Sequence, residues 1–329
     1  MIKNESRIAW LTPSGMTLAA LAVTCAFALP TQAAEYPSKP IRMLIPFAPG
    51  GSTDILARVV ATHLTQAWGQ QVVPENRPGA NGIIAAEILT KSPADGHTLL
   101  FVAIGHAINS LIYKKLPYDT ERDFTPISLA ATYTQLVIVH PSVPARSVKE
   151  LIALAKAQRI NYASGGIGSS QHLAGALFSH MAGIKINHVP YKGGAPGLLD
   201  VLAGNVEMMI TQPTSVEHIK IGRLRALAVS SPKRSPYWPE LPTVSEAALP
   251  GYQSEAWYGL VGPRNLPPDI LKKLNEETVR AIRAPALKEN LAITGGVPVG
   301  STPAEFSAFI KAEINRYAKV VRDAGISVD

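Results

Sequence analysis

The sequence of 329 residues is poor in three residue classes: it has one cysteine, 6% aromatic residues and 17% charged residues. A single cysteine excludes an intrachain disulfide framework and a zinc site built from several thiolates. The low charge excludes the composition of disordered chains, and the 47% of hydrophobic residues is enough for a folded core. The length predicts about two domains.

The sequence also lacks a hydrophobic run long enough to cross a bilayer, which needs roughly 20 residues. The clearest apolar run, Leu18 to Leu29, lies near the N-terminus, follows two basic residues and precedes Thr31-Gln32-Ala33. This order predicts a secretory signal peptide over residues 1–33, cleaved after Ala33 or Ala34. We therefore expect an exported protein without a membrane span, which in a bacterium means the periplasm.

The 31 basic and 24 acidic residues leave a net charge of +7. Cleavage removes Lys3, Arg7 and Glu5, so the mature charge is +7 − 1 = +6, and it removes Cys25 as well. The basic residues are scattered, with nothing denser than pairs such as Lys114-Lys115. Because a nucleic-acid site needs a basic stripe with interleaved aromatics, we expect no nucleic-acid partner. The charge at most favours the approach of small acids.

Short apolar runs alternate with helical patterns along the mature chain. The predicted strands are residues 41–45, 97–104, 136–139, 160–163, 185–189, 206–210, 224–229 and 258–261. The clearest helical patterns are residues 55–68, 147–157, 266–283 and 302–323. This alternation predicts an α/β fold made of βαβ units, with parallel sheets in both halves.

Two glycine-rich turns each follow a predicted strand and open a helix: PFAPGGSTD at residues 46–54 and SGGIGSS at residues 164–170. Glycine lets the backbone approach a ligand, and the helix that follows points unpaired N–H groups at it. In open α/β sheets, ligands bind at the carboxyl ends of the strands. The turns predict a carboxylate or phosphate site in a cleft between the two halves. The alternative is ordinary helix capping by the serines and threonine in the turns.

Motifs for nucleotide binding, hydrolysis and metal binding are missing. Neither turn carries the P-loop lysine, and Gln171 stands where a dinucleotide fingerprint has its third glycine. There is no Gly-x-Ser-x-Gly elbow, and His172, His180 and His188 are spaced too widely for one helical face and lack a nearby carboxylate. We therefore expect no catalytic residue, no metal and no cofactor. A contact between Asp54 and His172 would favour an enzyme instead.

Ordered motifs run along nearly the whole mature chain. They are YPSKPI at 36–41, PFAPGGSTD at 46–54, ENRPGANG at 75–82, PADGHTL at 93–99, GSSQHL at 168–173, VPYKGG at 189–194, and GY at 251–252 with WYGL at 257–260. Together they resemble the tripartite tricarboxylate transporter substrate-binding family, also called the Bug family of periplasmic receptors. The resemblance implies a type II periplasmic-binding-protein-like fold: two Rossmann-like α/β domains with a ligand cleft between them. We expect domain 1 over residues 34–131 plus 254–329 and domain 2 over residues 132–253.

The resemblance also implies which residues hold a ligand carboxylate, partly through ordered water. These are Phe47, Ala48, Gly51, Ser52 and Thr53 in the first turn, and Gly168, Ser169 and Ser170 in the second. Asp54 either accepts a hydrogen bond from the ligand or stabilises its own helix, with Arg58 four residues on as an ion-pair partner.

For the far end of the ligand, His106 and Asn109 either reach the cleft or bond within their own loop. Thr211, Gln212 and Glu255 are further candidates. The expected function is a monomeric, non-enzymatic receptor that delivers a di- or tricarboxylate, an aromatic acid or an acidic amino acid to integral membrane transporter components. The alternatives are an enzyme acting on an acid derivative in the same cleft, and a ligand-binding partner of a sensor system.

Overall fold

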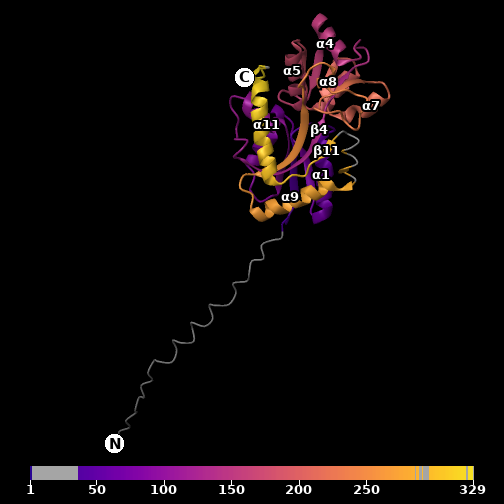
Figure 1. Ribbon diagram of the computed structural model, residues 1–329. Helices are drawn as coiled ribbons and strands as arrows, with labels where there is room; N and C mark the ends of the chain where they lie inside the picture. Colours follow the sequence, from indigo (N-terminus) through magenta and orange to yellow (C-terminus); the bar gives the residue numbers. More distant parts are fainter. Residues whose placement is uncertain (2–35, 286, 289–290, 292–295, 324, 329) are drawn as a thin grey trace. The chain divides into compact units, whose positions relative to one another are not determined.

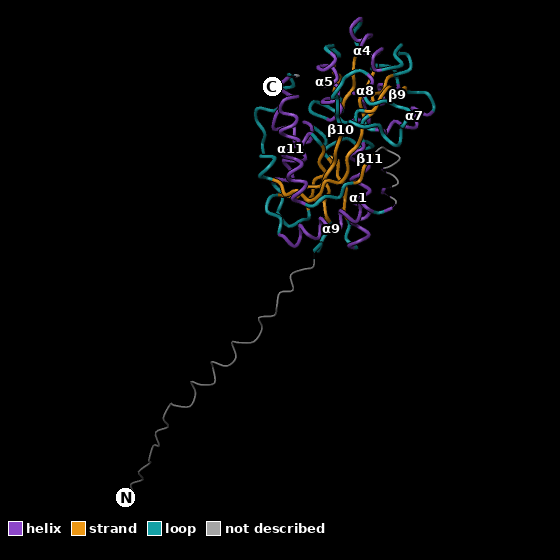
Figure 2. Tube along the Cα trace, viewed as in Figure 1, coloured by secondary structure: helices purple, strands orange, loops and turns teal. Residues whose placement is uncertain are grey.

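The computed structural model describes residue 1 and residues 36–285, 287–288, 291, 296–323 and 325–328. The predicted signal peptide and its cleavage site therefore lie outside the described residues. The compact unit Tyr36–Asp329 contains two β-sheets, and Figures 1 and 2 show their strands gathered between helices.

The first sheet has six strands in the order β11-β4-β10-β3-β1-β2. Their bounds are β1 (Ile41–Ile45), β2 (Val72–Asn76), β3 (Thr98–Ala103), β4 (Phe124–Thr134), β10 (Glu255–Pro263) and β11 (Gly296–Pro298). Strand β1 pairs in parallel with β2 and β3, whereas β10 is antiparallel to β3 and β4.

The second sheet has five strands in the order β7-β6-β8-β5-β9. Their bounds are β5 (Leu136–Val139), β6 (Asn161–Ser164), β7 (Asn187–Pro190), β8 (Met208–Thr211) and β9 (Arg225–Val229). Strands β7, β6 and β8 are parallel, whereas β5 is antiparallel to β8 and β9.

The prediction of parallel sheets in both halves is therefore wrong for the strands that connect the sheets. The chain passes from β4 directly into β5 across Gln135, and it returns through β10. Strand β4 leaves the first sheet toward the second and β10 returns to it, so the two strands run in opposite directions. Strand β5 follows β4 directly, without the crossover helix that a parallel pairing needs. Each sheet is consequently mixed: parallel on one side and antiparallel on the other.

Helices cover both faces of each sheet. They are α1 (Ser52–Trp68), α2 (Ile83–Thr90), α3 (Gly105–Ile112), α4 (Val148–Ala157), α5 (Ser170–Ala182), α6 (Gly194–Leu202), α7 (Val216–Lys220), α8 (Val244–Ala247), α9 (Pro268–Arg283) and α11 (Pro303–Asp323), with the 3-10 turns η1 (Ala80–Gly82) and η2 (Pro213–Ser215). The predicted helices ending at residues 68, 157, 283 and 323 are confirmed. We call the first sheet with its helices the first lobe, and the second sheet with its helices the second lobe.

The core follows the two-residue alternation of the strands. In β1, Ile41, Met43 and Ile45 pack with α1 and α9, whereas Leu44 packs on the opposite face with α2, α3 and α11. Because both faces are covered, strands such as β3 (TLLFVA) and β5 (LVIV) are buried along their whole length, as is usual for sheets that are buried on both sides. In Figure 1, α9 and α11 lie along the first lobe, and α4, α7 and α8 lie in the second.

Three buried polar residues hold the point where the chain crosses between the lobes. The Gln135 backbone N–H donates to Ser230 Oγ at 2.9 Å, and Ser230 Oγ donates to the Ser254 carbonyl. The Ser254 hydroxyl in turn donates to Gln135 Oε1 at 3.2 Å. The predicted domain boundary after residue 131 falls inside β4, which continues to Thr134; the division into two domains stays a prediction.

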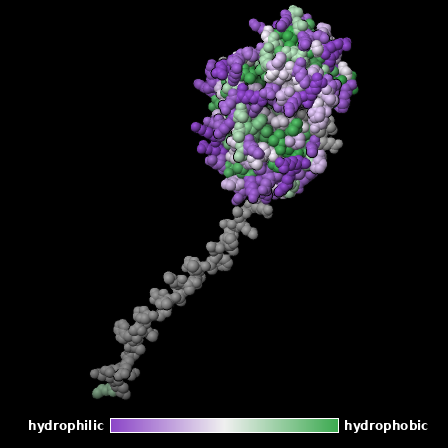
Figure 3. Space-filling view, viewed as in Figure 1, coloured by the Kyte–Doolittle hydropathy of each residue, from purple (hydrophilic) through white to green (hydrophobic). Residues whose placement is uncertain are grey.

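Hydrophilic residues cover most of the face seen in Figure 3, with smaller apolar areas between them. Large exposed apolar side chains, such as Leu199 and Ile221, are single rather than gathered into one segment. Among the helices that the structure describes, none has the length and hydropathy that a membrane crossing requires.

Candidate functional site

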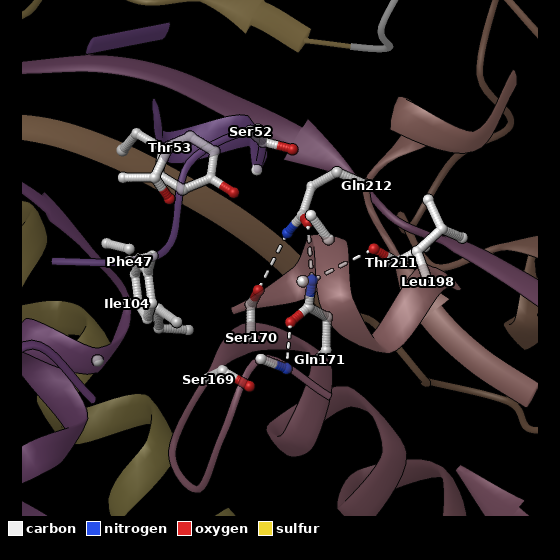
Figure 4. A pocket seen from close by; sticks show the side chains of 18 residues that line it. Phe47, Ser52, Thr53, Ile104, Ser169, Ser170, Gln171, Leu198, Thr211 and Gln212 are labelled. Atoms are coloured by element: carbon white, nitrogen blue, oxygen red, sulfur yellow. Dashed lines mark hydrogen bonds between the residues drawn. The ribbon is translucent and has the colours of Figure 1, made fainter. Parts of the chain in front are cut away.

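A cavity of about 110 Å³ lies where the carboxyl ends of strands from both sheets meet. The first lobe contributes the β1–α1 turn, the end of β3 and Tyr258 of β10, whereas the second lobe contributes the turns after β6, β7 and β8. Figure 4 shows the side chains from the two lobes facing each other across this space. The lining residues are Phe47, Gly50, Gly51, Ser52, Thr53, Ala103, Ile104, Gly105, Gly165, Ser169, Ser170, Gln171, Gly194, Ala195, Leu198, Thr211, Gln212 and Tyr258.

Four helices begin at this cavity: α1, α3, α5 and α6. The first turn of α1 has Gly51 as its N-cap, without a capping side chain. Within the described part of the chain, no protein acceptor is recorded for the N–H groups of Ser52 and Thr53 or for those of Ser170 and Gly194. Free N–H groups and the positive ends of four helix dipoles therefore surround the cavity.

No charged side chain occurs among the described residues that line the cavity. The polar lining consists of hydroxyl and amide groups, and the apolar lining includes Phe47, Ile104 and Leu198. Burial raises the pKa of Tyr258 to about 12, against hydrogen bonds from Thr53 and Ser52 that lower it. The phenol is thus protonated at neutral pH and can act as a donor. Such a lining suits an anion that is recognised by dipoles rather than by a counter-charge.

Asp54 shapes the first turn and does not line the cavity. Its carboxylate accepts from Gly50 N at 3.0 Å, from Arg58 Nε at 2.9 Å and from Asn76 Nδ2 at 2.9 Å. Burial alone would raise the pKa of Asp54, but these hydrogen bonds and the Arg58 guanidinium outweigh it and hold the pKa below its ordinary value. The predicted Asp54–Arg58 ion pair is confirmed. Asn76 also stabilises the turn, because its side chain donates to the Phe47 carbonyl.

Two histidines contact residues of the second turn through polar atoms. Gly168 N donates to His172 Nδ1 at 3.0 Å, so this N–H is already satisfied within the protein. His172 stacks on His188 with ring centroids 4.0 Å apart, and His188 Nε2 lies 2.6 Å from Ser164 Oγ. Ser169 is the N-cap of α5 and accepts from His172 N at 3.3 Å, so it caps a helix and lines the cavity at once.

His106 and Asn109 lie beside a smaller cavity of about 10 Å³ that shares Phe47 with the main one. Asn109 Oδ1 accepts from Asn81 Nδ2 at 2.9 Å. His106 Nε2 is buried without a hydrogen-bond partner among the described residues. Burial lowers the pKa of His106 to about 4, so the ring is neutral at pH 7.

The predicted site residues thus divide into three groups. Those that line the main cavity are Phe47, Gly51, Ser52, Thr53, Ser169, Ser170, Thr211 and Gln212. His106 and Asn109 line the smaller cavity behind Phe47. Ala48, Asp54, Gly168 and Glu255 line neither. The assignment of all of these as ligand-binding residues stays a prediction.

Two residues of the third group have other surroundings. A Cβ atom on Gly193 would lie 3.4 Å from Ala48 N, so Ala48 lies directly against the β7–α6 turn of the second lobe. Glu255 begins β10; burial raises its pKa, the nearby Arg316 opposes this and Glu313 adds to it. Glu255 therefore belongs to a partly buried charge cluster at the crossing rather than to the cavity.

Several lining residues were not predicted from the sequence, above all Gln171, Tyr258 and the Gly194–Ala195 start of α6. A local signal existed for α6, because Gly193-Gly194 follows a strand in the same way as the other glycine turns. Tyr258 stands in the WYGL motif, but that motif did not indicate a binding residue, because Tyr258 lies within a strand and reaches the cavity only where the chain crosses between the lobes.

Asp54 and His172, which a hydrolytic mechanism would need as neighbours, have separate sets of hydrogen-bond partners. Asp54 is bonded to Gly50, Arg58 and Asn76, whereas His172 is bonded to Gly168 and Ser169. Within the described ranges, no group of three or more histidine, cysteine or acidic side chains is placed to hold a metal ion.

Comparisons with known proteins agree on one family. The model of the tripartite tricarboxylate transporter family receptor matches residues 56–326. The protein BugT of Bordetella pertussis is 38% identical over 307 residues, which are 92% of this chain and 94% of BugT. The solved structure of R. palustris Rpa4515 with adipate is 38% identical, has a TM-score of 0.86, and covers 89% of this chain and 99% of its own. MatC from Rhodopseudomonas palustris with bound malate is 30% identical, has a TM-score of 0.81, and covers 87% of this chain and 100% of its own.

Proposed function

This chain belongs to the tripartite tricarboxylate transporter receptor family, and on that premise we propose that it is a periplasmic receptor that captures a small organic carboxylate. The receptor binds the ligand between its two lobes and delivers it to integral membrane components of a transporter. It acts without catalysis, as a monomer, after export by the N-terminal signal peptide. Adipate and malate, bound in two relatives, support a small carboxylate as the ligand class.

One observation carries this proposal: the N-termini of four helices meet at a cavity that no charged side chain lines among the described residues. A carboxylate would accept hydrogen bonds from the free N–H groups of α1 in the first lobe and of α5 and α6 in the second. The helix dipoles favour negative charge at this point. A cationic ligand would find no carboxylate there to pair with.

Capture by closure follows from the position of the cavity between the lobes. A ligand that contacts the turns of both lobes stabilises the closed arrangement more than an open one, and so shifts the population toward it. The predicted domains, residues 34–131 plus 254–329 and residues 132–253, are the bodies that move in this proposal. The hinge is the crossing held by Gln135, Ser230 and Ser254.

The experiment is a thermal-shift screen followed by calorimetry on the purified protein. The panel contains adipate, malate, citrate, benzoate and glutamate, with phosphoesters and a short oligonucleotide as comparators. We expect at least one carboxylate to raise the melting temperature and to bind with a micromolar Kd, which corresponds to about 8 kcal/mol of binding free energy.

Stabilisation by phosphoesters or by the oligonucleotide alone would contradict the proposal. Turnover of a carboxylate ester or amide by the purified protein would favour the enzyme alternative instead. The delivery step has its own test: deletion of the gene should abolish uptake of the bound carboxylate, and a copy encoding a variant unable to bind it should fail to restore uptake.

A further inference from the structure

A chain of four hydrogen bonds runs along the second-lobe wall of the cavity (Figure 4). It begins at the backbone of Gly165, whose N–H donates to Gln171 Oε1 at 2.7 Å. A backbone N–H can only donate, so the oxygen of the Gln171 amide must face it. The orientation of this amide is therefore determined, and its nitrogen points the other way, toward the end of β8.

The second amide is then determined by the first. Gln171 Nε2 donates to Thr211 Oγ1 and to Gln212 Oε1, both at 3.2 Å. Because the Gln212 oxygen faces Gln171, the Gln212 nitrogen faces α5, where it donates to Ser170 Oγ at 3.0 Å. Gln171 is 6% exposed and Gln212 is 3% exposed, so bulk water does not compete for these bonds.

These hydrogen bonds also determine the orientation of two hydroxyl groups, those of Ser170 and Thr211. The oxygens of Ser170 and Thr211 each accept an amide N–H, so their own hydrogens must point elsewhere. Both residues line the cavity, and among the described residues no acceptor is recorded for either hydrogen. The hydrogens are therefore available to an acceptor inside the cavity.

We propose that Gln171 and Gln212 determine specificity by holding the hydroxyls of Ser170 and Thr211 as hydrogen-bond donors, so that this wall selects a carboxylate against its primary amide. The inference rests on the proposed function and sharpens it. A carboxylate offers acceptors only and matches two donors. An amide that presents its NH₂ group to the same wall gives the two hydroxyl hydrogens no acceptor and leaves them unpaired, which costs affinity.

The test uses ratios of affinities, with Gln212→Met as the central variant. Methionine is similar in length and uncharged, so it releases the Ser170 hydroxyl without adding charge to the cavity. The probes are the carboxylates of the screen and their primary amides: adipate and adipamide, malate and malamide, benzoate and benzamide. For the best-bound carboxylate, we expect the ratio of amide Kd to carboxylate Kd to fall by about tenfold in the variant, the lower end of what a hydrogen bond to a charged group is worth.

Two further variants make the expected direction specific. Gln212→Glu presents two acceptor oxygens, so the Ser170 hydroxyl would donate to the introduced carboxylate and stop donating to the ligand. Its negative charge also repels a carboxylate ligand, so for both reasons the ratio should fall further than in Gln212→Met. Thr211→Val removes one donor to the ligand and one of the two acceptors of Gln171 Nε2, which keeps its bond to Gln212 Oε1. Carboxylate affinity should therefore fall about tenfold while amide affinity stays within about twofold. Gln158→Met, at an exposed position after α4, is the matched control and should leave both affinities unchanged.

The outcomes separate this inference from the proposed function. A parallel loss of carboxylate and amide affinity in Gln212→Met, with the ratio unchanged, would show a structural role only and overturn the inference while the receptor function stands. If Gln212→Met does not fold, as judged by its melting transition, Thr211→Val and Ser170→Ala decide, and unchanged carboxylate affinity in both overturns the inference. Failure of every carboxylate to bind the wild-type protein would overturn both proposals.

Discussion

At the scale of single residues, a strained turn lies between the lobes. Gly79, Ala80, Asn81 and Gly82 all have positive φ, with Ala80 at 45° and Asn81 at 50°. Non-glycine residues with positive φ each cost roughly 1 kcal/mol or more, and such strain is commonest at functional sites. The turn places the Asn81 side chain against Gly168 of the second lobe, where a Cβ atom would lie 2.6 Å from Asn81 Nδ2.

Gly168→Ala tests this close approach. The new methyl group would lie 2.5 Å from Ile112 Cδ1 and 2.6 Å from Asn81 Nδ2, so the second turn would have to move away from the first lobe. The matched control is Gly222→Ala, with φ of 74° against 77° at Gly168 and with open space around it. Both variants should lose about 1 kcal/mol of stability from backbone strain, but only Gly168→Ala should weaken ligand binding, by tenfold or more. Equal affinities in the two variants would contradict this.

Gly51→Leu tests the first turn. Gly51 has a φ of −81°, and a Cβ atom there would meet only Ala48 O, at 3.9 Å, so the backbone accepts a side chain. A leucine would extend into the cavity and occupy the space of the proposed ligand. We expect binding to be lost by calorimetry, while the free energy of unfolding falls by no more than about 1 kcal/mol, the cost of a poor N-cap. Gly51→Ala should give a smaller loss, and wild-type affinity in Gly51→Leu would remove this turn from the site.

At the scale of elements, the helices that open at the cavity are capped differently. Ser169 caps α5 with its side chain, whereas α1 has the glycine N-cap Gly51 and leaves its first N–H groups free. Capping stabilises a helix, but a capping side chain also takes N–H groups that a ligand would otherwise bind. The two turns of similar sequence therefore offer different donors: backbone N–H from α1, and hydroxyl groups with fewer free N–H from α5.

Ser169→Ala and Ser147→Ala form a matched pair at this scale. Each serine is an N-cap: Ser169 accepts from His172 N at 3.3 Å, and Ser147 of α4 accepts from Glu150 N at 3.2 Å. Each substitution should cost about 1 kcal/mol in urea unfolding, because each removes one capping bond. Only Ser169→Ala should also weaken ligand binding, since Ser169 lines the cavity and Ser147 does not. A loss of affinity in Ser147→Ala would mean that binding follows general stability instead.

At the scale of the whole molecule, buried histidines make stability depend on pH. Burial lowers the pKa of His106 to about 4 and of His188 to about 4; burial and the adjacent His188 lower the pKa of His172 to about 3. Each folded value lies below the ordinary value of 6.5, so the unfolded chain binds these protons more readily than the folded chain. Their contribution to stability is complete above pH 6.5 and is lost as pH falls toward 4.

Urea unfolding at pH 7 and at pH 5 measures this loss. Below pH 6.5, each of these histidines costs up to about 1.4 kcal/mol per pH unit, so the free energy of unfolding should fall by a few kcal/mol by pH 5. His106→Leu removes one titrating ring, so the slope of the free energy of unfolding against pH should fall by the contribution of one proton. The pKa values of Asp54, Glu75 and Asp95 are lowered, so these carboxylates destabilise the fold only at lower pH. Burial raises the pKa values of Glu255 and Glu313, so these two carboxylates oppose the histidine effect as pH falls. An unchanged slope in His106→Leu would contradict the burial of this ring.

The elements that sequence analysis identified are those with a local signal. The helices α9 and α11 begin at proline-containing starts and follow an apolar stripe, and both were predicted to their last residue. Strand β4 was missed, because its sequence FTPISLAATYT contains Pro126 and its burial does not alternate. The direction of β5 and β10 was missed as well, because strand pairing depends on how the chain crosses between sheets and not on the composition of a strand.

The sequence by itself determined the short-range features: the alternation of strands and helices, the two glycine turns and the ordered motifs of one receptor family. These depend on backbone freedom and on side-chain spacing over a few residues, which any local segment displays. Only the tertiary structure decided which distant groups meet: Gln171 with Thr211 and Gln212 at the cavity, about 40 positions apart, and Asn81 with Gly168 across the lobes. The physical reason is that hydrogen-bond direction and steric contact depend on positions set by the packing of the two sheets, and no local pattern encodes them.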